Sequence, residues 1–319
     1  MARKLTCICL ILMLLAGLTA GCAPNQPEDG RLRVVASIFP EYDFARAIAG
    51  GLARVDMLIA PGASIHTYDP SPADILTLRR ADIFLYVGGE SDVWADRLLA
   101  SLDKTIPQNG FASHMTALRL MDHVKLLREE HKEGMAGPAE EGEDAWDEHI
   151  WTSPKNAIGL VGAICAAMCA ADPANAAAYE ENAAAYVEQL AQVDAEIMEI
   201  VAQAKRKTIV VADRFPFLYF VRDYGLDYAA AFPGCSDQTD AGADTLLHLI
   251  NTAKREQAPY IYRAELSGES FARAVARAAG AQVLPLNSCH NVTREAFDAG
   301  ATYVSLMRQN AENLRKGLN

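Results

Sequence analysis

Three histidines of this chain stand in short polar segments that interrupt or follow apolar runs. His66 lies in PGASIHTYDP, His149 in DEHIWTSP and His290 in PLNSCHN. Neutral imidazole is a borderline donor that suits Zn²⁺, Cu²⁺, Ni²⁺ and iron, and three imidazoles with a fourth oxygen, sulfur or water ligand fit a tetrahedral zinc ion. A single histidine is more often a surface side chain than a ligand. The hypothesis of a shared metal site therefore depends on a fold that brings the three together.

Short β-prone runs alternate with helical patterns along most of the chain. The strand-like runs are 32–38, 55–59, 83–87, 208–212, 226–230, 260–262 and 282–286, and the helical segments between them include 42–49, 71–78, 90–102, 217–224, 244–256, 270–279 and 301–318. This alternation predicts an α/β fold with two lobes, each a parallel sheet flanked by helices. Ligands of open α/β sheets bind beyond the carboxyl ends of the strands, where His66 and His290 fall.

One long helix is expected between the two lobes. Its apolar residues recur at spacings of three and four and share one face: Tyr179, Ala183, Tyr186, Leu190, Val193, Ile197 and Ile200. Asp172 is the predicted N-cap, with Pro173 just inside the helix. We therefore divide the chain into an N-terminal lobe, 32–171, a connecting helix, 172–206, and a C-terminal lobe, 207–319.

The N-terminal segment is typical of an exported protein. The apolar run 5–18 is too short and wrongly flanked for a spanning helix. It leads into LTAGC, which resembles a bacterial lipobox, although Thr19 stands where that pattern prefers an aliphatic residue. We expect 1–21 to be a signal peptide, Cys22 to carry acyl chains, and 22–31 to form a tether. An ordinary signal peptide with an incidental cysteine is the alternative, and both place the protein outside the cytoplasm.

The charge of the chain restricts its partners. The formal net charge is -12, which argues against nucleic acid and against a basic membrane-binding surface. Residues 129–148 are acidic, contain Gly and Pro, and have little to bury, so we predict a mobile loop there. Its carboxylates are expected to raise the local concentration of cations.

Few cysteines remain after the N-terminal segment. Cys165 and Cys169 lie four apart in an alanine-rich helical pattern, so we expect them to pack as small apolar residues. Cys235 and Cys289 are the pair available for one disulfide outside the cytoplasm.

The whole chain after the signal segment resembles the substrate-binding lipoproteins of zinc and manganese ABC transporters. PGASIHTYDP, with His66, is similar to the first ligand motif of that family, and DEHIWTSP, with His149, is similar to the second. The segment 211–226 and the helix from Ala301 to Asn310 are also similar to the family pattern. The resemblance implies a bilobal receptor that binds a metal ion between its lobes.

Two positions depart from the family pattern. Arg214 stands where the family has its third ligand, and a guanidinium has no lone pair to give to a metal. Asn287 stands where the family has an Asp. We expect His290 to replace these ligands, with Glu265 and Cys289 as reserves. Arg214 would then pair with Glu265 or Asp240, either closing the cleft as a cation or forming a structural ion pair.

The resemblance implies a monomeric, lipid-anchored receptor that hands Zn²⁺, or less readily Mn²⁺, to an ABC permease, without enzymatic activity. Three imidazoles favour zinc, because manganese prefers oxygen ligands. The first alternative is an extracytoplasmic zinc hydrolase with Asp69, Glu148 or Glu265 as its base, although no HExxH motif is present. The second alternative is a surface adhesion lipoprotein with a structural metal.

Overall fold

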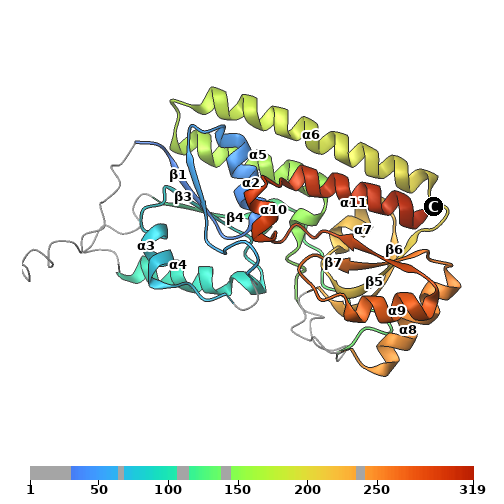
Figure 1. Cartoon of the computed structure of the whole chain (residues 1–319). Helices are drawn as coiled ribbons and strands as arrows, with labels where there is room; N and C mark the ends of the chain where they lie inside the picture. The colour runs from blue at the N-terminus through green and yellow to red at the C-terminus, as the bar shows by residue number, and fades with distance from the viewer. Residues whose placement is uncertain (1–29, 64–67, 106–114, 138–144, 235–240) are drawn as a thin grey trace, which may run out of the picture. The chain divides into compact units, whose positions relative to one another are not determined.

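Two four-stranded parallel sheets form the framework of residues 32–319 in this computed structural model (Figure 1). The structure describes residues 30–63, 68–105, 115–137, 145–234 and 241–319. The predictions for the signal peptide, Cys22, His66, Cys235 and Asp240 lie outside the described residues. The predicted two-lobe α/β architecture is confirmed, with one sheet in each lobe.

The N-terminal sheet has the strand order β2-β1-β3-β4. Its strands are β1 (Arg33–Ala36), β2 (Arg54–Met57), β3 (Ile83–Tyr86) and β4 (Thr116–Arg119). The first three were expected from their apolar runs, whereas β4 is mostly exposed and carries no such run. The helices of this lobe are α2 (Phe39–Ala49), α3 (Pro72–Leu78), α4 (Val93–Thr105) and α5 (Pro154–Ala171), with 3-10 turns η1 (Glu90–Asp92), η3 (Leu120–His123) and η4 (Ile150–Thr152).

The C-terminal sheet has the strand order β6-β5-β7-β8. Its strands are β5 (Thr208–Phe215), β6 (Asp227–Pro233), β7 (Tyr260–Ala264) and β8 (Gln282–Leu286), and its helices are α7 (Leu218–Tyr224), α8 (Ala243–Arg255), α9 (Ser270–Ala279), α10 (Arg294–Asp298) and α11 (Tyr303–Leu318). Strand β5 runs three residues beyond the predicted 208–212. Its register against β6 shifts between Val211 and Arg214. Such an irregularity changes the direction of the side chains beside it.

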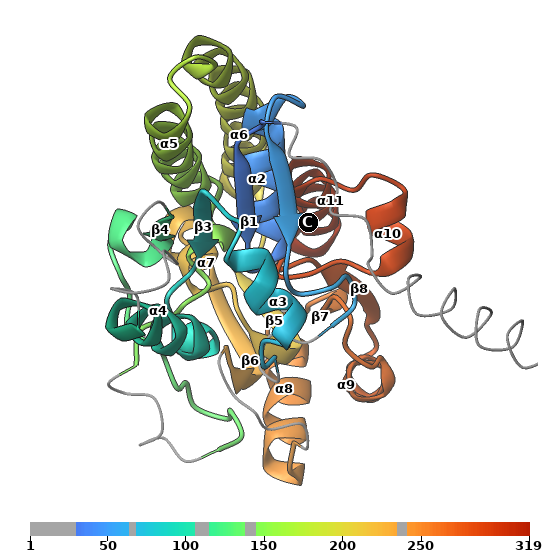
Figure 2. The same ribbon diagram turned by 90° about the vertical axis from the view of Figure 1, so that its left-hand side faces the viewer.

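The long helix α6 (Ala176–Gln203) spans both lobes (Figure 1). It packs against α2 and α5 of the N-terminal lobe and against α7 and α11 of the C-terminal lobe. Figure 2 shows α5 and α6 side by side. All seven predicted face residues are buried. The helix begins later than predicted, because Asp172 instead accepts hydrogen bonds from Asn175 Nδ2 at 2.7 Å and from the Tyr179 hydroxyl at 2.8 Å.

One hydrophobic core runs through both lobes. It joins Val34 and Ile83 of the N-terminal sheet to Ile209 of the C-terminal sheet through the buried face of α6. Two smaller clusters fill the outer faces, under α3 and α4 in one lobe and under α8 and α9 in the other. Helix α5 is long and apolar enough to cross a membrane by length and composition, yet its Leu160 and Ile164 are fully buried in the core. The sheets are therefore parts of one packed unit.

The described part of the acidic segment contacts the C-terminal lobe. The Ala136 amide donates to the Ala231 carbonyl of β6 at 2.8 Å. Glu130 pairs with Arg222 and accepts from the Tyr228 hydroxyl at 3.1 Å. Composition alone does not reveal these contacts with the edge strand β6. The mobility of the segment stays a prediction.

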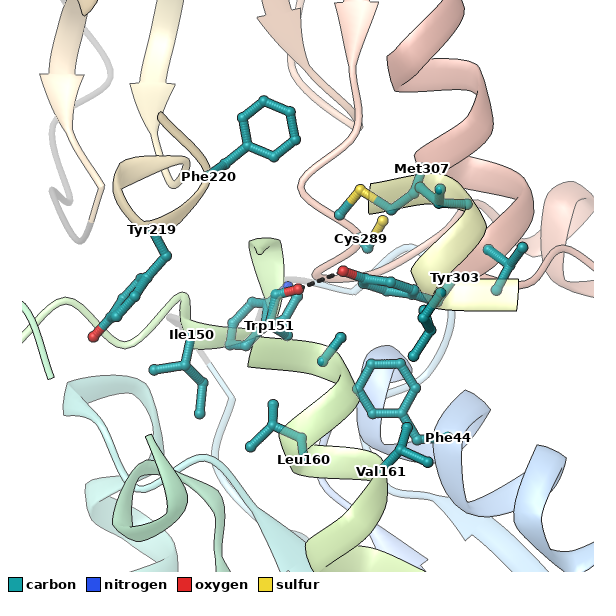
Figure 3. Packing of buried hydrophobic residues seen from close by; sticks show 14 of the residues in the cluster. Phe44, Ile150, Trp151, Leu160, Val161, Tyr219, Phe220, Cys289, Tyr303 and Met307 are labelled. Carbon is teal, nitrogen blue, oxygen red and sulfur yellow. Dashed lines mark hydrogen bonds between the residues drawn. The ribbon is translucent and has the colours of Figure 1, made fainter. Parts of the chain in front are cut away.

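The described cysteines carry free thiols. Cys165 and Cys169 lie side by side on α5 with their sulfurs 3.9 Å apart, as small packed residues. Cys289 is free and fully buried, and Figure 3 shows it in the cluster with Tyr303 and Met307. The structure therefore gives no support to the predicted bridge from Cys289 to Cys235.

Candidate metal-binding site

His149 is held at the junction of the two lobes. It precedes η4 and α5, and its side chain is 1% exposed. Trp151 Nε1 donates to the Ser288 carbonyl at 2.8 Å, and the Tyr303 hydroxyl donates to the Trp151 carbonyl at 2.7 Å (Figure 3). Because Ser288 and Tyr303 belong to the C-terminal half, the segment that carries His149 is tied to both lobes.

Asp147 orients the His149 ring. Its Oδ1 accepts the His149 backbone amide at 2.7 Å and lies 3.1 Å from His149 Nδ1. A carboxylate on Nδ1 selects the tautomer whose Nε2 is free to bind a metal, and it raises the basicity of the ring. Burial lowers the pKa of His149, but the carboxylates of Asp147, Glu148 and Glu129 offset this, and the pKa lies above the ordinary value of 6.5.

Glu148 anchors the same segment to the N-terminal sheet. Its carboxylate is buried and accepts the Ser91 amide at 2.9 Å and the Ser91 hydroxyl. Gly89 lies so close that an added Cβ would stand 2.2 Å from Glu148 Oε2. Glu148 is therefore a structural acceptor here, with its oxygens turned toward the N-terminal lobe.

His290 is positioned by the loop that follows β8. Glu265 accepts the Ser288 amide at 2.6 Å, the Ser288 hydroxyl, and the His290 amide at 3.3 Å. Cys289 adopts a left-handed conformation with φ of 60°, which turns its thiol to the core as the chain passes to His290. Asn291 Nδ2 donates to the Ala60 and Ala63 carbonyls at 3.0 and 2.8 Å, so the loop is also attached to the segment after β2.

A cavity of about 230 Å³ opens between these loops. Its lining includes His149 and His290 together with Ala63, Arg214 and Glu265. The centroids of the two imidazoles lie 6.1 Å apart, with their planes at 81°. Two imidazoles bound to one tetrahedral zinc ion have centroids about 5 Å apart, given Zn–N bonds of about 2.0 Å. A small adjustment therefore brings His149 and His290 to a common ion.

Comparison with known proteins identifies the family. Residues 34–317 match the family model described as zinc-uptake complex component A, periplasmic, or ZnuA. The chain belongs to the ZnuA family. The resemblance noted from the two histidine motifs is confirmed.

Relatives match this ZnuA-family chain over most of its length. The zinc-binding lipoprotein AdcA of Streptococcus pneumoniae R6 is 33% identical over 315 residues, which cover 96% of this chain and 60% of AdcA. The high-affinity zinc uptake system protein ZnuA of Bacillus subtilis is 28% identical over 310 residues, covering 97% and 95% of the two chains. The chain thus spans about 60% of the length of the AdcA proteins it matches.

Solved structures agree with this fold. The Zn(II)-bound ZnuA-like domain of Streptococcus pneumoniae AdcA superposes with a TM-score of 0.74 at 30% identity, covering 91% of this chain and 99% of that domain. The metal-dependent lipoprotein YcdH of Bacillus subtilis gives 0.74 at 27% identity, covering 91% and 100%.

The predicted site residues of the ZnuA-family chain have different outcomes. His149 and His290 meet in the cavity, whereas His66 lies outside the described residues. Among the residues that the structure describes, no three His, Cys, Asp or Glu side chains are arranged to hold a metal ion. Cys289 is absent from the described lining of the cavity, and Glu265 holds the His290 loop.

Arg214 and Asn287 lie in different surroundings. Arg214 lines the cavity, but it forms no ion pair with Glu265, whose oxygens are engaged by Ser288 and His290. Asn287 is turned away toward α11, where its Nδ2 donates to Gln309 Oε1 at 2.9 Å and its amide donates to Asn310 Oδ1 at 2.7 Å.

Three positioning residues escaped the sequence reasoning. Asp147 stands two residues before His149, a spacing that was available as a signal, since ligand histidines commonly bind a carboxylate. Trp151 reaches Ser288 across 137 positions, which no local pattern reveals. Gly234 ends β6 beside His149, where an added Cβ would lie 3.2 Å from the ring and 3.0 Å from the Phe215 carbonyl oxygen.

Proposed function

We propose that this chain is an extracytoplasmic receptor that binds Zn²⁺ and delivers it to an ABC-type metal uptake permease. The observation that carries the proposal is the pair His149 and His290, which face each other across a cavity between the two sheets. His66 is the proposed third ligand, and it follows the lining residue Ala63 by three positions.

The donor set supports zinc over manganese. Two imidazoles come from the described residues, and one of them is backed by the Asp147 carboxylate. Imidazole suits zinc, whereas manganese prefers oxygen donors, and the nearby carboxylate of Glu265 is already engaged by hydrogen bonds. Mn²⁺ is therefore the weaker candidate cargo.

Transport is better supported than catalysis. The family is a transport component, and a hydrolase would need a general base at the metal. Glu148 is bound by Ser91, and Glu265 by Ser288 and His290. Two of the three carboxylates considered as that base are thus engaged in hydrogen bonds, which favours a receptor over a hydrolase.

The proposed delivery of zinc also gives a role to Cys22 and to the two-lobe architecture. Cys22 would hold the receptor at the outer face of the bacterial membrane as a lipid-anchored monomer. Ligands drawn from both lobes favour a closed cleft when metal is bound, since the ion binds that state better. Helix α6, which packs on both lobes, limits this closure to a small movement. The permease would recognise the closed state.

A titration of the metal-free protein tests the proposal. We expect one Zn²⁺ per chain, bound tightly in competition with a chromophoric chelator, with weaker binding of Mn²⁺ and no turnover of ester, peptide or phosphate substrates. Affinity should fall as the pH is lowered, because protons compete for the same nitrogens. The raised pKa of His149 places the start of this loss above that of an ordinary imidazole.

A cell-based measurement separates the alternatives. Deletion of the gene should reduce zinc uptake from zinc-poor medium, and a chain with His149→Ala should fail to restore it. Normal uptake in the deletion strain would reject delivery to a permease and leave the adhesion alternative. Hydrolysis that depends on bound zinc would instead support the enzyme.

A further inference from the structure

Arg214 is a cation placed in the wall of the proposed metal cavity. It stands near the end of β5, just after the register shift against β6, and it lines the cavity together with His149 and His290. The side chain is half-buried. Within the part of the chain that the structure describes, its guanidinium takes part in no hydrogen bond or ion pair, and only its backbone amide is bonded, to Asp213 Oδ1 at 2.9 Å.

The carboxylates nearest to Arg214 are committed to other groups. Asp213 accepts the Arg214 amide and, through Oδ2, the Ala264 amide at 3.1 Å. Glu265 accepts from Ser288 and from the His290 amide. Both carboxylates therefore hold backbone in place. The charge of Arg214 favours the ionised form of Asp213, but neither carboxylate is hydrogen-bonded to the guanidinium.

A divalent ion at the two imidazoles would add positive charge beside this guanidinium. In a cavity that is partly screened from water, like charges repel far more strongly than in bulk solvent. Neutral imidazoles contribute no negative charge to compensate. The cavity of about 230 Å³ offers more room than one ion with a single water requires. An anion between the guanidinium and the ion would balance the charges and add an oxygen ligand to the two imidazoles.

Resting on the proposed zinc binding, we propose that Arg214 forms an anion subsite, where a small carboxylate-type oxyanion such as bicarbonate or acetate binds together with Zn²⁺. A guanidinium holds a carboxylate through two parallel hydrogen bonds, which suits this planar chemistry. The anion would present an oxygen to the ion, so that the zinc is bound by both imidazole nitrogens and oxygen. Arg214 thereby acts in place of a protein carboxylate, with the negative charge recruited from solution.

The test is the dependence of zinc affinity on the anion. Metal-free protein is titrated with zinc against a chromophoric chelator in a carbonate-free, carboxylate-free buffer, and again with added bicarbonate or acetate at matched ionic strength. We expect each oxyanion to raise the affinity by about tenfold or more, the equivalent of about 1.4 kcal/mol. Zinc should raise the affinity for ¹³C-bicarbonate by the same factor, because coupling between two bound ligands is reciprocal.

Substitutions assign the effect to the guanidinium. Arg214→Gln should bind zinc equally well in both buffers, with an unchanged thermal unfolding midpoint, because it has lost the cation that recruits the anion. Arg277→Gln, which removes an exposed arginine of α9 outside the described lining of the cavity, should keep the full response.

Each other outcome overturns the inference in a recognisable way. Equal zinc affinity of the unmodified chain in both buffers would reject the anion subsite and leave zinc binding intact. A retained response in Arg214→Gln would reject the role of this residue. An absence of zinc binding in every buffer would instead reject the proposed function itself.

Discussion

The two walls of the cavity are built in different ways. On the N-terminal side, the His149 ring and amide both bind Asp147, and the segment is tied by Trp151 to the opposite lobe. On the C-terminal side, His290 ends a loop that is held through Glu265, and the neighbouring Arg214 has no acceptor among the described residues. One wall thus presents an oriented donor, and the other presents a guanidinium that interacts with the Asp213 carboxylate only through space.

This difference indicates on which side of the cavity a substitution should affect metal affinity more. A ligand whose tautomer and direction are set by a second group loses function when either is altered. On the opposite wall, His290 lies in the loop after β8 and Arg214 lies near the end of β5, so a loop residue and a strand residue share that wall. We expect changes in the N-terminal wall to have the larger effect on affinity.

Removal of the His149 imidazole should have the largest effect. His149→Ala eliminates one of about four ligands, and roughly 10–16 kcal/mol shared among four ligands gives a loss of about a hundredfold or more in zinc affinity. Chelator competition at neutral pH measures it. The exposed His123 provides the control, since His123→Ala should leave the affinity unchanged. Equal affinities of both variants would remove His149 from the site.

Loss of the carboxylate behind the ring should have the second largest effect. Asp147→Asn keeps an oxygen for the His149 amide but removes the charge, so zinc affinity should fall by about 10- to 100-fold. The pKa of His149 should fall as well, which an NMR titration of the ring protons measures. Asp122→Asn, at an exposed ion pair with Arg119, is the control. An unaltered His149 pKa would show that the carboxylate does not act on the ring.

The sequence predicted most of the framework because the framework is periodic. The alternation of buried strands with helical segments led to both sheets, and the three-and-four spacing from Tyr179 to Ile200 led to α6. Strand β4 and helix α10 were missed because neither has a buried apolar run. A strand that is recognised only by pairing with β3 has no local signature.

The proposed ligands came from the sequence, whereas the residues that support them did not. His149 and His290 were found because imidazole is scarce and each stood in a polar segment beside an apolar run. Glu265 was assigned as a reserve ligand, yet its oxygens serve Ser288 and His290, because a buried carboxylate must be satisfied by nearby donors. The role of such a carboxylate depends on which backbone amides lie near it in the fold. Contacts between residues far apart in the chain cannot be predicted from the sequence of a single segment.

A smaller change tests how closely the two walls must fit. Gly234→Ala would place a Cβ 3.2 Å from the His149 ring and 3.0 Å from the Phe215 carbonyl oxygen, so the ring must shift. We expect a several-fold loss of zinc affinity with little change in unfolding temperature. Gly159→Ala, in α5 with nothing within 4 Å of its added Cβ, should keep the affinity and stabilise the helix by about 1 kcal/mol. Identical zinc affinities of the two variants would mean that this end of β6 does not set the ring.

Behind the N-terminal wall lies a row of buried carboxyl groups, formed by Glu41, Asp92 and Glu148. We expect Glu41 to affect the stability of the fold but not the orientation of His149. Glu41 accepts the Ser37 and Ile38 amides through Oε2, while its Oε1 and Asp92 Oδ1 are buried without a partner among the described groups. Burial and the charge of Asp92 raise the pKa of Glu41 to about 8. Burial and Glu148 raise the pKa of Asp92 to about 7. Near neutral pH the folded chain therefore holds protons that the unfolded chain has released.

The sign of the resulting pH dependence follows from this difference in bound protons. The folded pKa of Glu41 lies above its unfolded value of 4.5, so its contribution to stability is complete below pH 4.5 and is lost as the pH rises toward about 8. Glu41→Gln carries a permanent neutral group, and its unfolding free energy should decline less between these limits, by up to about 1.4 kcal/mol per pH unit. Urea unfolding at several pH values measures the slope. Zinc affinity at neutral pH should stay unchanged, because Glu41 supports the sheet and touches neither imidazole. Parallel stability profiles for the two chains would show that Glu41 is ionised in the folded state, and a large fall in affinity would show that the carboxyl row also sets the ligand.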